Sequence, residues 1–317
     1  MYPNGLRVLR DMSPQLFREV QEAGYPYKYR RWERHDGTEV AVAEENVLSD
    51  RDDSLQTIGI RRWRLQRVLY DAARRADIPI HFAKRTKSVS SLPDGTVEII
   101  FEDGTKRTAH VVFGADGSKS AVRNSVADCG AKLQYTGTTC LMGIGSDTKS
   151  QSRGISLPSS STSHCHGAFF PTGEDEFCFQ FHFPVAAQDA DEGNWGTLSQ
   201  EMGRKECRKL AERLKKEGWH EKYLEPLANV DVAVRIGFCL LDKQLKKLVY
   251  GHRGRIVLLG DAARECHTFL ETPPLDPLLF SSHQASNGYF HLTFLFMSIG
   301  TSQIRPYPFW VRGHKWE

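Results

Sequence analysis

The sequence predicts an α/β protein in which a parallel sheet with flanking helices carries an inserted, mixed β-sheet domain. The first observation is the apolar run IVLLGD at 256–261, which is typical of a buried parallel strand that ends on a glycine and a carboxylate. The second is a similar junction, HVVFGAD, at 110–116. The third is the strictly alternating segment EFCFQFHFP at 176–184, which indicates a strand of a different sheet.

Composition limits the classes of protein. The 317 residues suffice for about two domains, and 40% hydrophobic with 26% charged residues is ordinary for a globular chain. The formal net charge of +3 gives no reason to expect a nucleic-acid partner. The seven cysteines form no C-x-x-C pair, and charges interrupt the N-terminus where a signal peptide would be apolar. We therefore expect reduced thiols and a cytoplasmic protein.

The first third of the chain alternates helical and extended patterns. Apolar spacing predicts short helices over 6–23, interrupted at Ser13-Pro14. A turn signal at 36–37 predicts a hairpin over 25–45. The stripe in RRWRLQRVLYDAARRA predicts an amphipathic helix over 61–76, and a strand is expected at 78–83.

An antiparallel meander is expected next, followed by the inserted domain. Strands at 86–91 and 96–102 are separated by turn residues, and the strand at 110–113 leads into the Gly-Asp junction. In 130–249 the Phe-rich segment places four phenylalanines on one face, and the remaining patterns predict a helix at 198–219, a strand at 230–241 and a serine loop at 159–163.

The two strand-to-aspartate junctions carry the predicted chemistry. Doubly wound sheets bind ligands at the carboxyl ends of their strands. A carboxylate there can accept hydrogen bonds from sugar hydroxyls, and glycine allows the backbone to approach closely. Two such ends therefore suggest one extended ligand, such as a dinucleotide, met at two points. The alternative reading is that Asp116 and Asp261 only cap the helices that follow them.

Four segments in order carry a family resemblance. HVVFGADGSKSAVR at 110–123 resembles the DG motif of the FAD-dependent aromatic hydroxylases, the group A flavin monooxygenases that include para-hydroxybenzoate and salicylate hydroxylases. GRIVLLGDAAR at 254–264 resembles the GD motif of that family. RWRLQRVL at 62–69 is similar to its Arg-x-x-Leu-x-x-x-Leu helix, and PNGLRVLRDM at 3–12 to the segment after its first βαβ unit.

The resemblance implies a Rossmann-like FAD-binding fold of the aromatic-hydroxylase type with an inserted mixed-sheet substrate domain. The family's opening GxGxxG turn has no counterpart here, so the first βαβ unit is expected to be missing. The domains so implied are an FAD-binding part at 1–23, 52–128 and 250–264, a substrate domain at 24–51 and 129–249, and a divergent tail at 265–317.

The cofactor-binding residues implied by the resemblance are Arg62, Asp116, Gly117, Gly260, Asp261 and Ala262. Asp261 would hydrogen-bond the ribityl chain of FAD, Gly260 and Ala262 would lie near the pyrophosphate, and Asp116 would help to hold FAD. Arg62 would lie beside the cofactor. The resemblance assigns no catalytic residue and no metal.

The implied activity is that of an FAD-dependent monooxygenase of secondary metabolism. NADPH or NADH would reduce the flavin, and molecular oxygen would give a flavin hydroperoxide that hydroxylates or epoxidises an aromatic or polyketide-like small molecule. The alternatives are another FAD-dependent oxidoreductase of the same fold, or a catalytically dead binding module. The co-substrate, the substrate and the oligomeric state stay open.

The ends of the chain depart from the family pattern. The similarity stops at Arg264, and we hypothesise a truncated or mis-spliced product, or a gene-model artefact, with unrelated sequence at its end. Residues 277–304 carry no charge, but their apolar core at 289–299 is shorter than the ~20 residues of a membrane span. We expect an aggregation-prone tail and no membrane anchor.

Other polar residues support smaller expectations. The segment HCH at 164–166 is not expected to bind metal, because adjacent strand residues face opposite ways. Gln180 and His182 share one face of the Phe-rich strand, either toward substrate or on a solvated outer face, and the latter is favoured. Arg235 is expected to have a surface role.

Overall fold

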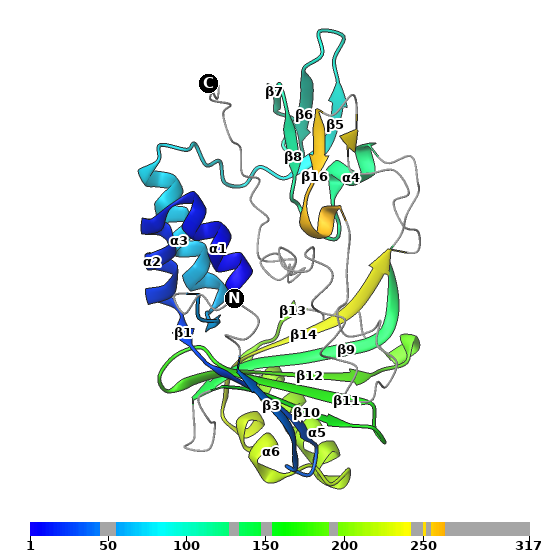
Figure 1. Ribbon diagram of the computed structural model, residues 1–317. Helices are drawn as coiled ribbons and strands as arrows, with labels where there is room; N and C mark the ends of the chain where they lie inside the picture. The colour runs from blue at the N-terminus through cyan, green and yellow to red at the C-terminus, as the bar shows by residue number, and fades with distance from the viewer. Residues whose placement is uncertain are drawn as a thin grey trace. The chain divides into compact units, whose positions relative to one another are not determined.

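The computed structural model has two compact units (Figure 1). It describes residues 1–44, 55–126, 133–146, 154–189, 196–241, 250–251 and 255–263. Unit 1 comprises Met1–Tyr70 with Gly137–Phe238, and unit 2 comprises Asp71–Thr136 with Cys239–Glu317. These units are compact parts of the chain and do not show which residues hold a cofactor, so the predicted domain boundaries stay a prediction. The expectations for the tail fall outside the described residues.

Unit 1 begins with two helices, as predicted. They are α1 (Pro3–Met12) and α2 (Pro14–Ala23), each with a proline in its first turn, where no backbone donor is lost. Ser13 separates them and caps α2, because its Oγ accepts a hydrogen bond from the Leu16 amide at 3.2 Å. Leu6 and Val20 are fully buried, so the apolar faces of these helices form part of a core.

The main sheet of unit 1 has eight strands and is mixed, as predicted. Strands β10 and β2 pair in parallel, whereas β2 with β3, β10 with β11, β11 with β12, and β12 with β9 pair antiparallel. In spatial order the strands are β13 (Gly196–Thr197), β14 (Val230–Leu241), β9 (Leu133–Ser146), β12 (Glu176–Pro184), β11 (Cys165–Pro171), β10 (Gly154–Ser160), β2 (Tyr29–Arg34) and β3 (Glu39–Glu44). A separate two-stranded ribbon joins β1 (Tyr25–Pro26) to β4 (Ile58–Gly59).

Two helices cover one face of this sheet (Figure 1). The Phe-rich strand β12 turns Phe177, Phe179 and Phe181 toward α5 (Gln200–Lys216) and α6 (Glu221–Ala228), where all three are buried. The predicted alternation is therefore confirmed. Helix α6 was not predicted, because it is only eight residues long and contains Pro226, a residue disfavoured inside helices.

In the part of unit 2 that the structure describes, two small sheets pack with the short helix α4 (Ala121–Val126). The antiparallel sheet β5 (Thr86–Ser91), β6 (Val97–Phe101) and β7 (Lys106–Ala109) is the predicted meander, with β7 as a third strand that the sequence pattern did not separate from β8. The second sheet has the order β15 (Tyr250–Gly251), β16 (Ile256–Leu258) and β8 (Val112–Gly114). Their buried residues form one core with α4.

Three turns share the sequence Asp-Gly-Thr, at 36–38, 94–96 and 103–105. Their glycines have φ of 91°, 82° and 81°, in the left-handed region that glycine tolerates. In each turn the aspartate Oδ1 accepts a hydrogen bond from the threonine amide at 2.9 Å. This bond is the main cause that lowers the pKa of Asp36 and Asp94, whereas the pKa of Asp103 is lowered mainly by its hydrogen bond from Lys84. The predicted turn positions are thus confirmed, with a local physical cause.

Two predicted elements need correction. Helix α3 (Arg62–Arg75) forms as expected, but residues 78–83 form no strand. Asp77 and Ala83 have φ of 51° and 59°, which no strand geometry allows, and most side chains between them are exposed. The serine loop predicted at 159–163 starts later, because Ser159 and Ser160 still belong to β10.

Candidate cofactor site

The two Gly-Asp junctions lie at the same edge of one sheet in unit 2. Strands β8 and β16 are parallel neighbours, with Gly114 opposite Leu258, and the Leu259 amide donates to the Gly114 carbonyl at 2.8 Å. Because parallel neighbours end on the same side, Asp116 and Asp261 both follow the carboxyl ends of this pair. This is the sheet edge at which doubly wound folds bind ligands.

Asp116 caps the helix that follows it. Its Oδ2 accepts hydrogen bonds from the amides of Ala121 at 2.8 Å and Val122 at 3.2 Å, and its Oδ1 accepts one from the Ser120 hydroxyl. These contacts satisfy donors that the first turn of α4 leaves open. The capping interpretation of this aspartate is therefore correct, and any contact with a ligand would use the remaining lone pairs of its oxygens.

The second junction is a buried turn of 3₁₀ helix, η5 (Gly260–Ala262). Asp261 is 7% exposed and Ala262 is fully buried. Gly260 has φ of 58° and Gly117, in the first loop, has φ of 81°, so both loops use a conformation that favours residues without a Cβ. Small residues therefore line the backbone at both strand ends.

A buried arginine joins the two loops. Arg123 is 3% exposed, and its Nη1 donates to the carbonyl oxygens of Asp261 and Ala262, each at 3.3 Å. Its Nη2 donates to the Ser118 carbonyl, and its own amide donates to Ser120 Oγ at 2.9 Å. This arginine lies inside the first motif, but no role was predicted for it from the sequence. Its contacts make it the residue that fixes one loop against the other.

The remaining predicted cofactor-binding residue, Arg62, belongs to unit 1, where it is exposed at the start of α3. Its neighbours Arg61 and Arg64 hold Glu176 at the start of β12. Arg61 forms an ion pair with this carboxylate, and Arg64 lies 3.8 Å from it while donating to the Thr172 carbonyl at 3.2 Å. Burial opposes the charge of Glu176, but hydrogen bonds from Arg61 and Thr172 hold its pKa below the ordinary value.

The sheet face opposite α5 and α6 carries polar and thiol groups. Pairing sets His166, His182 and Cys140 side by side on β11, β12 and β9, with the Cys140 Sγ 3.9 Å from His182 Nε2. His182 is only 8% exposed, so the expectation of a solvated outer face is wrong for it. Burial raises the pKa of the Cys178 thiol on this face to about 12, which keeps it protonated.

Arg235, on β14, contacts a helix of unit 1. Its Nη1 lies 3.7 Å from Oε2 of Glu206 on α5.

Comparison with known proteins identifies the family. The sequence profile described as an FAD binding domain matches residues 16–268, which include both junctions and α3. The chain belongs to the FAD-binding domain family. The predicted family is thereby confirmed, and the group A flavin monooxygenases are its relatives.

Curated relatives of this FAD-binding domain chain are fungal. It is 28% identical over 132 residues to the FAD-dependent monooxygenase olcE of Penicillium canescens, covering 42% of this chain and 27% of olcE. It is 35% identical over 63 residues to the FAD-dependent monooxygenase tazP of Aspergillus terreus, covering 20% of this chain and 16% of tazP. The matched segments thus span about a quarter or less of these relatives.

Solved structures confirm the predicted fold. Klebsiella pneumoniae HpxO, crystallised with FAD and uric acid, superposes with a TM-score of 0.67 at 21% identity, over 83% of this chain and 63% of HpxO. CtdE in complex with FAD and a substrate gives a TM-score of 0.68 at 17% identity, over 83% of this chain and 64% of CtdE. The chain therefore spans less than two thirds of the length of either protein.

The residues at the two strand ends fit a flavin dinucleotide. The left-handed glycines and the small side chain of Ala262 add little side-chain bulk at the two turns, and a carboxylate follows each strand. Among the described residues, no cluster of three or more His, Cys, Asp or Glu side chains could hold a metal ion. The site chemistry thus suits a sugar and phosphate ligand.

Proposed function

We propose that this chain binds FAD at the β8 and β16 strand ends and serves NAD(P)H-driven oxygenation of a small aromatic or polyketide-like molecule. The observation that carries this proposal is the placement of Asp116 and Asp261 after two neighbouring parallel strands, with Arg123 joining their loops. The family match and the names of the fungal relatives support it.

Each predicted residue has a proposed role at this site. Asp261 would accept hydrogen bonds from the ribityl hydroxyls, and Gly260 and Ala262 would let the pyrophosphate approach the backbone. Asp116 and Gly117 would support the cofactor from the first loop. For Arg62, the family resemblance implies a place beside the cofactor. When bound, FAD would supply the redox chemistry, and the side chains named here would position it.

We propose that the polar sheet face of unit 1 contacts the substrate. Gln180 and His182 lie on the side of β12 away from the phenylalanine core, and His182 is nearly buried beside Cys140. The imidazole of His182 could exchange a proton with a phenolic hydroxyl group, and the amide of Gln180 could orient that hydroxyl through a hydrogen bond. His182→Gln is then expected to reduce the stimulation of NADPH oxidation by phenols, with FAD affinity unchanged.

Titration with FAD tests the cofactor site. Flavin fluorescence quenching is expected to report binding by the purified chain, and Asp261→Asn is expected to weaken it about 10- to 100-fold, because a charge-assisted hydrogen bond is worth about 1.5–3 kcal/mol. Asp231→Asn, at an exposed position of β14, is the matched control and should bind FAD normally. Equal affinities for the two variants would contradict the assignment.

Activity is tested separately from binding. A yellow protein that oxidises NADPH and consumes oxygen supports the enzyme, whereas a chain that binds FAD without oxidising NADPH supports the alternative of a binding module. Failure to bind FAD would overturn both. We further propose a cytoplasmic location, which the buried free thiols of Cys140, Cys165, Cys178 and Cys207 support.

A further inference from the structure

Helix α5 carries the positive charge of the molecule. Between Gln200 and Glu217 there are seven Lys or Arg residues and four Glu residues, an excess of three, which equals the formal net charge of the whole chain. The remainder of the chain is thus electrically balanced in this count. Helix α5 itself, Gln200–Lys216, carries seven Lys or Arg residues and three Glu residues.

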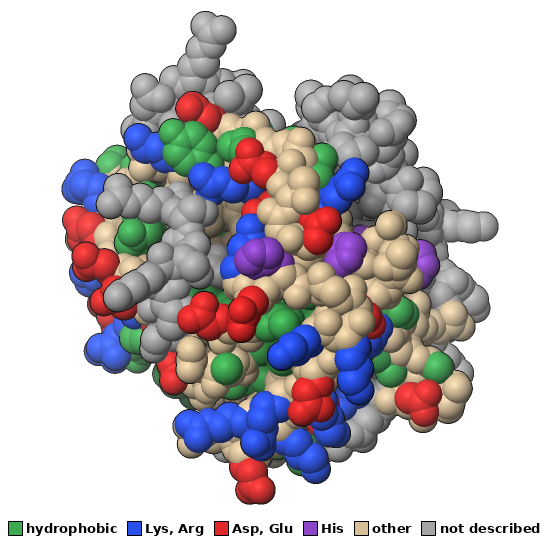
Figure 2. Space-filling model, turned by 90° about the horizontal axis from the view of Figure 1, so that it is seen from below, with side chains coloured by type: hydrophobic (Ala, Val, Ile, Leu, Met, Phe, Trp, Pro, Cys, Tyr) green, Lys and Arg blue, Asp and Glu red, His purple; other side chains and the backbone are tan. Residues whose placement is uncertain are grey.

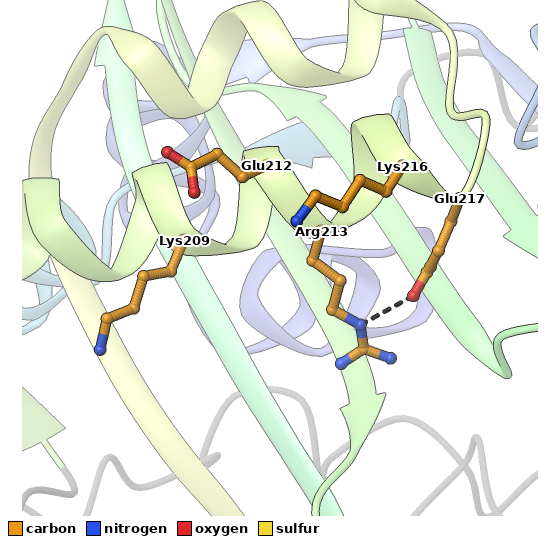
Figure 3. Close-up of a pocket in the computed structure, with 5 residues that line it drawn as sticks. All are labelled: Lys209, Glu212, Arg213, Lys216 and Glu217. Carbon is orange, nitrogen blue, oxygen red and sulfur yellow. Dashed lines mark hydrogen bonds and ion pairs between the residues drawn. The ribbon is translucent and has the colours of Figure 1, made fainter.

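Two of the four acids between Gln200 and Glu217 are engaged with cations. Glu206 lies 2.9 Å from Lys209 and 3.7 Å from Arg235, and Glu217 accepts a hydrogen bond from Arg213 at 2.8 Å (Figure 3). These pairs leave the outward face dominated by cations. Outside these pairs, the exposed cations of this segment are Arg204, Lys205, Arg208, Lys215 and Lys216, against the exposed acids Glu201 and Glu212.

The apolar side of α5 is committed to the core. Cys207 and Leu214 are fully buried and Leu210 is 5% exposed against the sheet, so this side is not available to another partner. The helix is 17 residues long, about 25 Å, and lies along the surface. Figure 2 shows this side of the molecule, with Lys and Arg side chains gathered on it. It therefore offers a long band of cations.

We propose that the outward face of α5 docks the protein on an anionic lipid bilayer. A band of exposed Lys and Arg side chains matches a planar lattice of acidic headgroups, each cation adding about 1 kcal/mol near such a surface. The hollow beside α5 is lined by Lys209, Glu212, Arg213, Lys216 and Glu217, with about 390 Å³ of space (Figure 3). Its mixed charges and single-helix wall do not suit a discrete anion.

The proposed contact is adsorption and not insertion. No helix of the described residues is long and apolar enough to cross a bilayer, and the apolar face of α5 is buried. Electrostatic adsorption must therefore weaken as salt screens the charges, over a Debye length of about 10 Å at 0.1 M salt. Such adsorption needs no membrane anchor, and the proposal does not depend on the proposed enzymatic function.

Vesicle sedimentation tests the proposal. The full chain is expected to sediment with phosphatidylserine-containing vesicles at low salt, to stay in solution with pure phosphatidylcholine vesicles, and to be released by high salt. The triple variant Arg204→Gln, Arg208→Gln, Lys215→Gln is expected to bind about 100-fold more weakly, at about fivefold per cation. Circular dichroism would verify that α5 still forms.

Two further variants sharpen the test. Lys28→Gln, Lys87→Gln, Arg107→Gln removes the same charge from exposed positions outside α5 and is expected to bind like the wild type. Arg204→Lys, Arg208→Lys, Lys215→Arg keeps the charge and is also expected to bind normally. The proposal is overturned if the wild type ignores phosphatidylserine, if both charge-removing variants lose binding equally, or if high salt does not release the protein.

Discussion

The large sheet of unit 1 and the β8–β16 pair of unit 2 differ in how far their apolar side chains are buried. In unit 1, Phe179 and Phe181 are fully buried beneath α5 and α6. In unit 2, one face of the parallel pair is buried with α4, but Phe113 on the other face is 50% exposed and Leu259 is 45% exposed. Parallel strands are ordinarily covered on both faces. The difference teaches that unit 2 depends more on polar connections, such as those of Arg123, than unit 1 does.

The largest expected effect compares a phenylalanine from each region. The ring of Phe181 packs edge-on against Phe169 and Trp219, with ring centroids 5.4 Å and 5.6 Å apart. Phe181→Ala removes this ring and should lower the free energy of unfolding of unit 1 by about 3–5 kcal/mol. Phe113→Ala should change that of unit 2 by less than about 0.5 kcal/mol. Hydrogen-exchange mass spectrometry reports the two units separately. Equal losses would contradict the comparison.

Removal of Arg123 should have the next largest effect. Arg123→Ala leaves three carbonyl groups without their charged donor, so we expect a loss of about 2–4 kcal/mol in unit 2. Faster amide exchange at 114–126 and 255–263 together would be its signature. Arg107→Ala, at an exposed position of β7, serves as the control and should leave both segments protected.

A glycine substitution should follow. A Cβ at Gly114 would lie 2.7 Å from Val122 Cγ1 and 2.9 Å from Leu258 Cδ2, so Gly114→Ala should destabilise unit 2 by about 1–3 kcal/mol. In unit 1, a Cβ at Gly5 of α1 would meet Met1 Cγ at an ordinary 3.5 Å. Gly5→Ala should therefore stabilise by about 0.5–1 kcal/mol, through helix propensity. Thermal unfolding would distinguish the opposite signs.

The smallest expected effect is a pH dependence in unit 1. The pKa of Glu176 is lowered in the folded state, so its stabilisation is complete above the ordinary value of 4.5 and is lost as pH falls through the folded pKa. Glu176→Gln should cost about 1 kcal/mol or less at neutral pH and should flatten this acid dependence. Urea unfolding at several pH values measures it. Glu174→Gln, nearby and exposed, should retain the wild-type profile.

Local patterns predicted much of the fold, because their causes are local. The alternation in 176–184 sets which side chains of β12 face the phenylalanine core, the Asp-Gly-Thr turns close on their own hydrogen bonds, and Ser13 caps α2 within three residues. Residues 78–83 looked like a strand by composition, but Asp77 just before them and Ala83 at their end are left-handed. Helix α6 could not be predicted from the sequence pattern, because the segment is short and contains Pro226.

The candidate site was predicted only in its local parts. Asp116 and Asp261 were identified from strand-to-glycine junctions, and the capping alternative for Asp116 could be stated because its partners lie within six residues. The contacts of Arg123 with Asp261 and Ala262 span 138 and 139 residues of sequence. No single-sequence pattern specifies such a pairing, nor that His182 becomes buried beside Cys140, 42 residues away.

The guanidinium of Arg123 makes the two strand-end loops move as one body. Since a single rigid plane grips carbonyl oxygens in both loops, thermal displacement of one loop is transmitted to the other. A molecule that orders either loop should then also restrict the motion of its neighbour. Heating should in turn release both loops in the same transition.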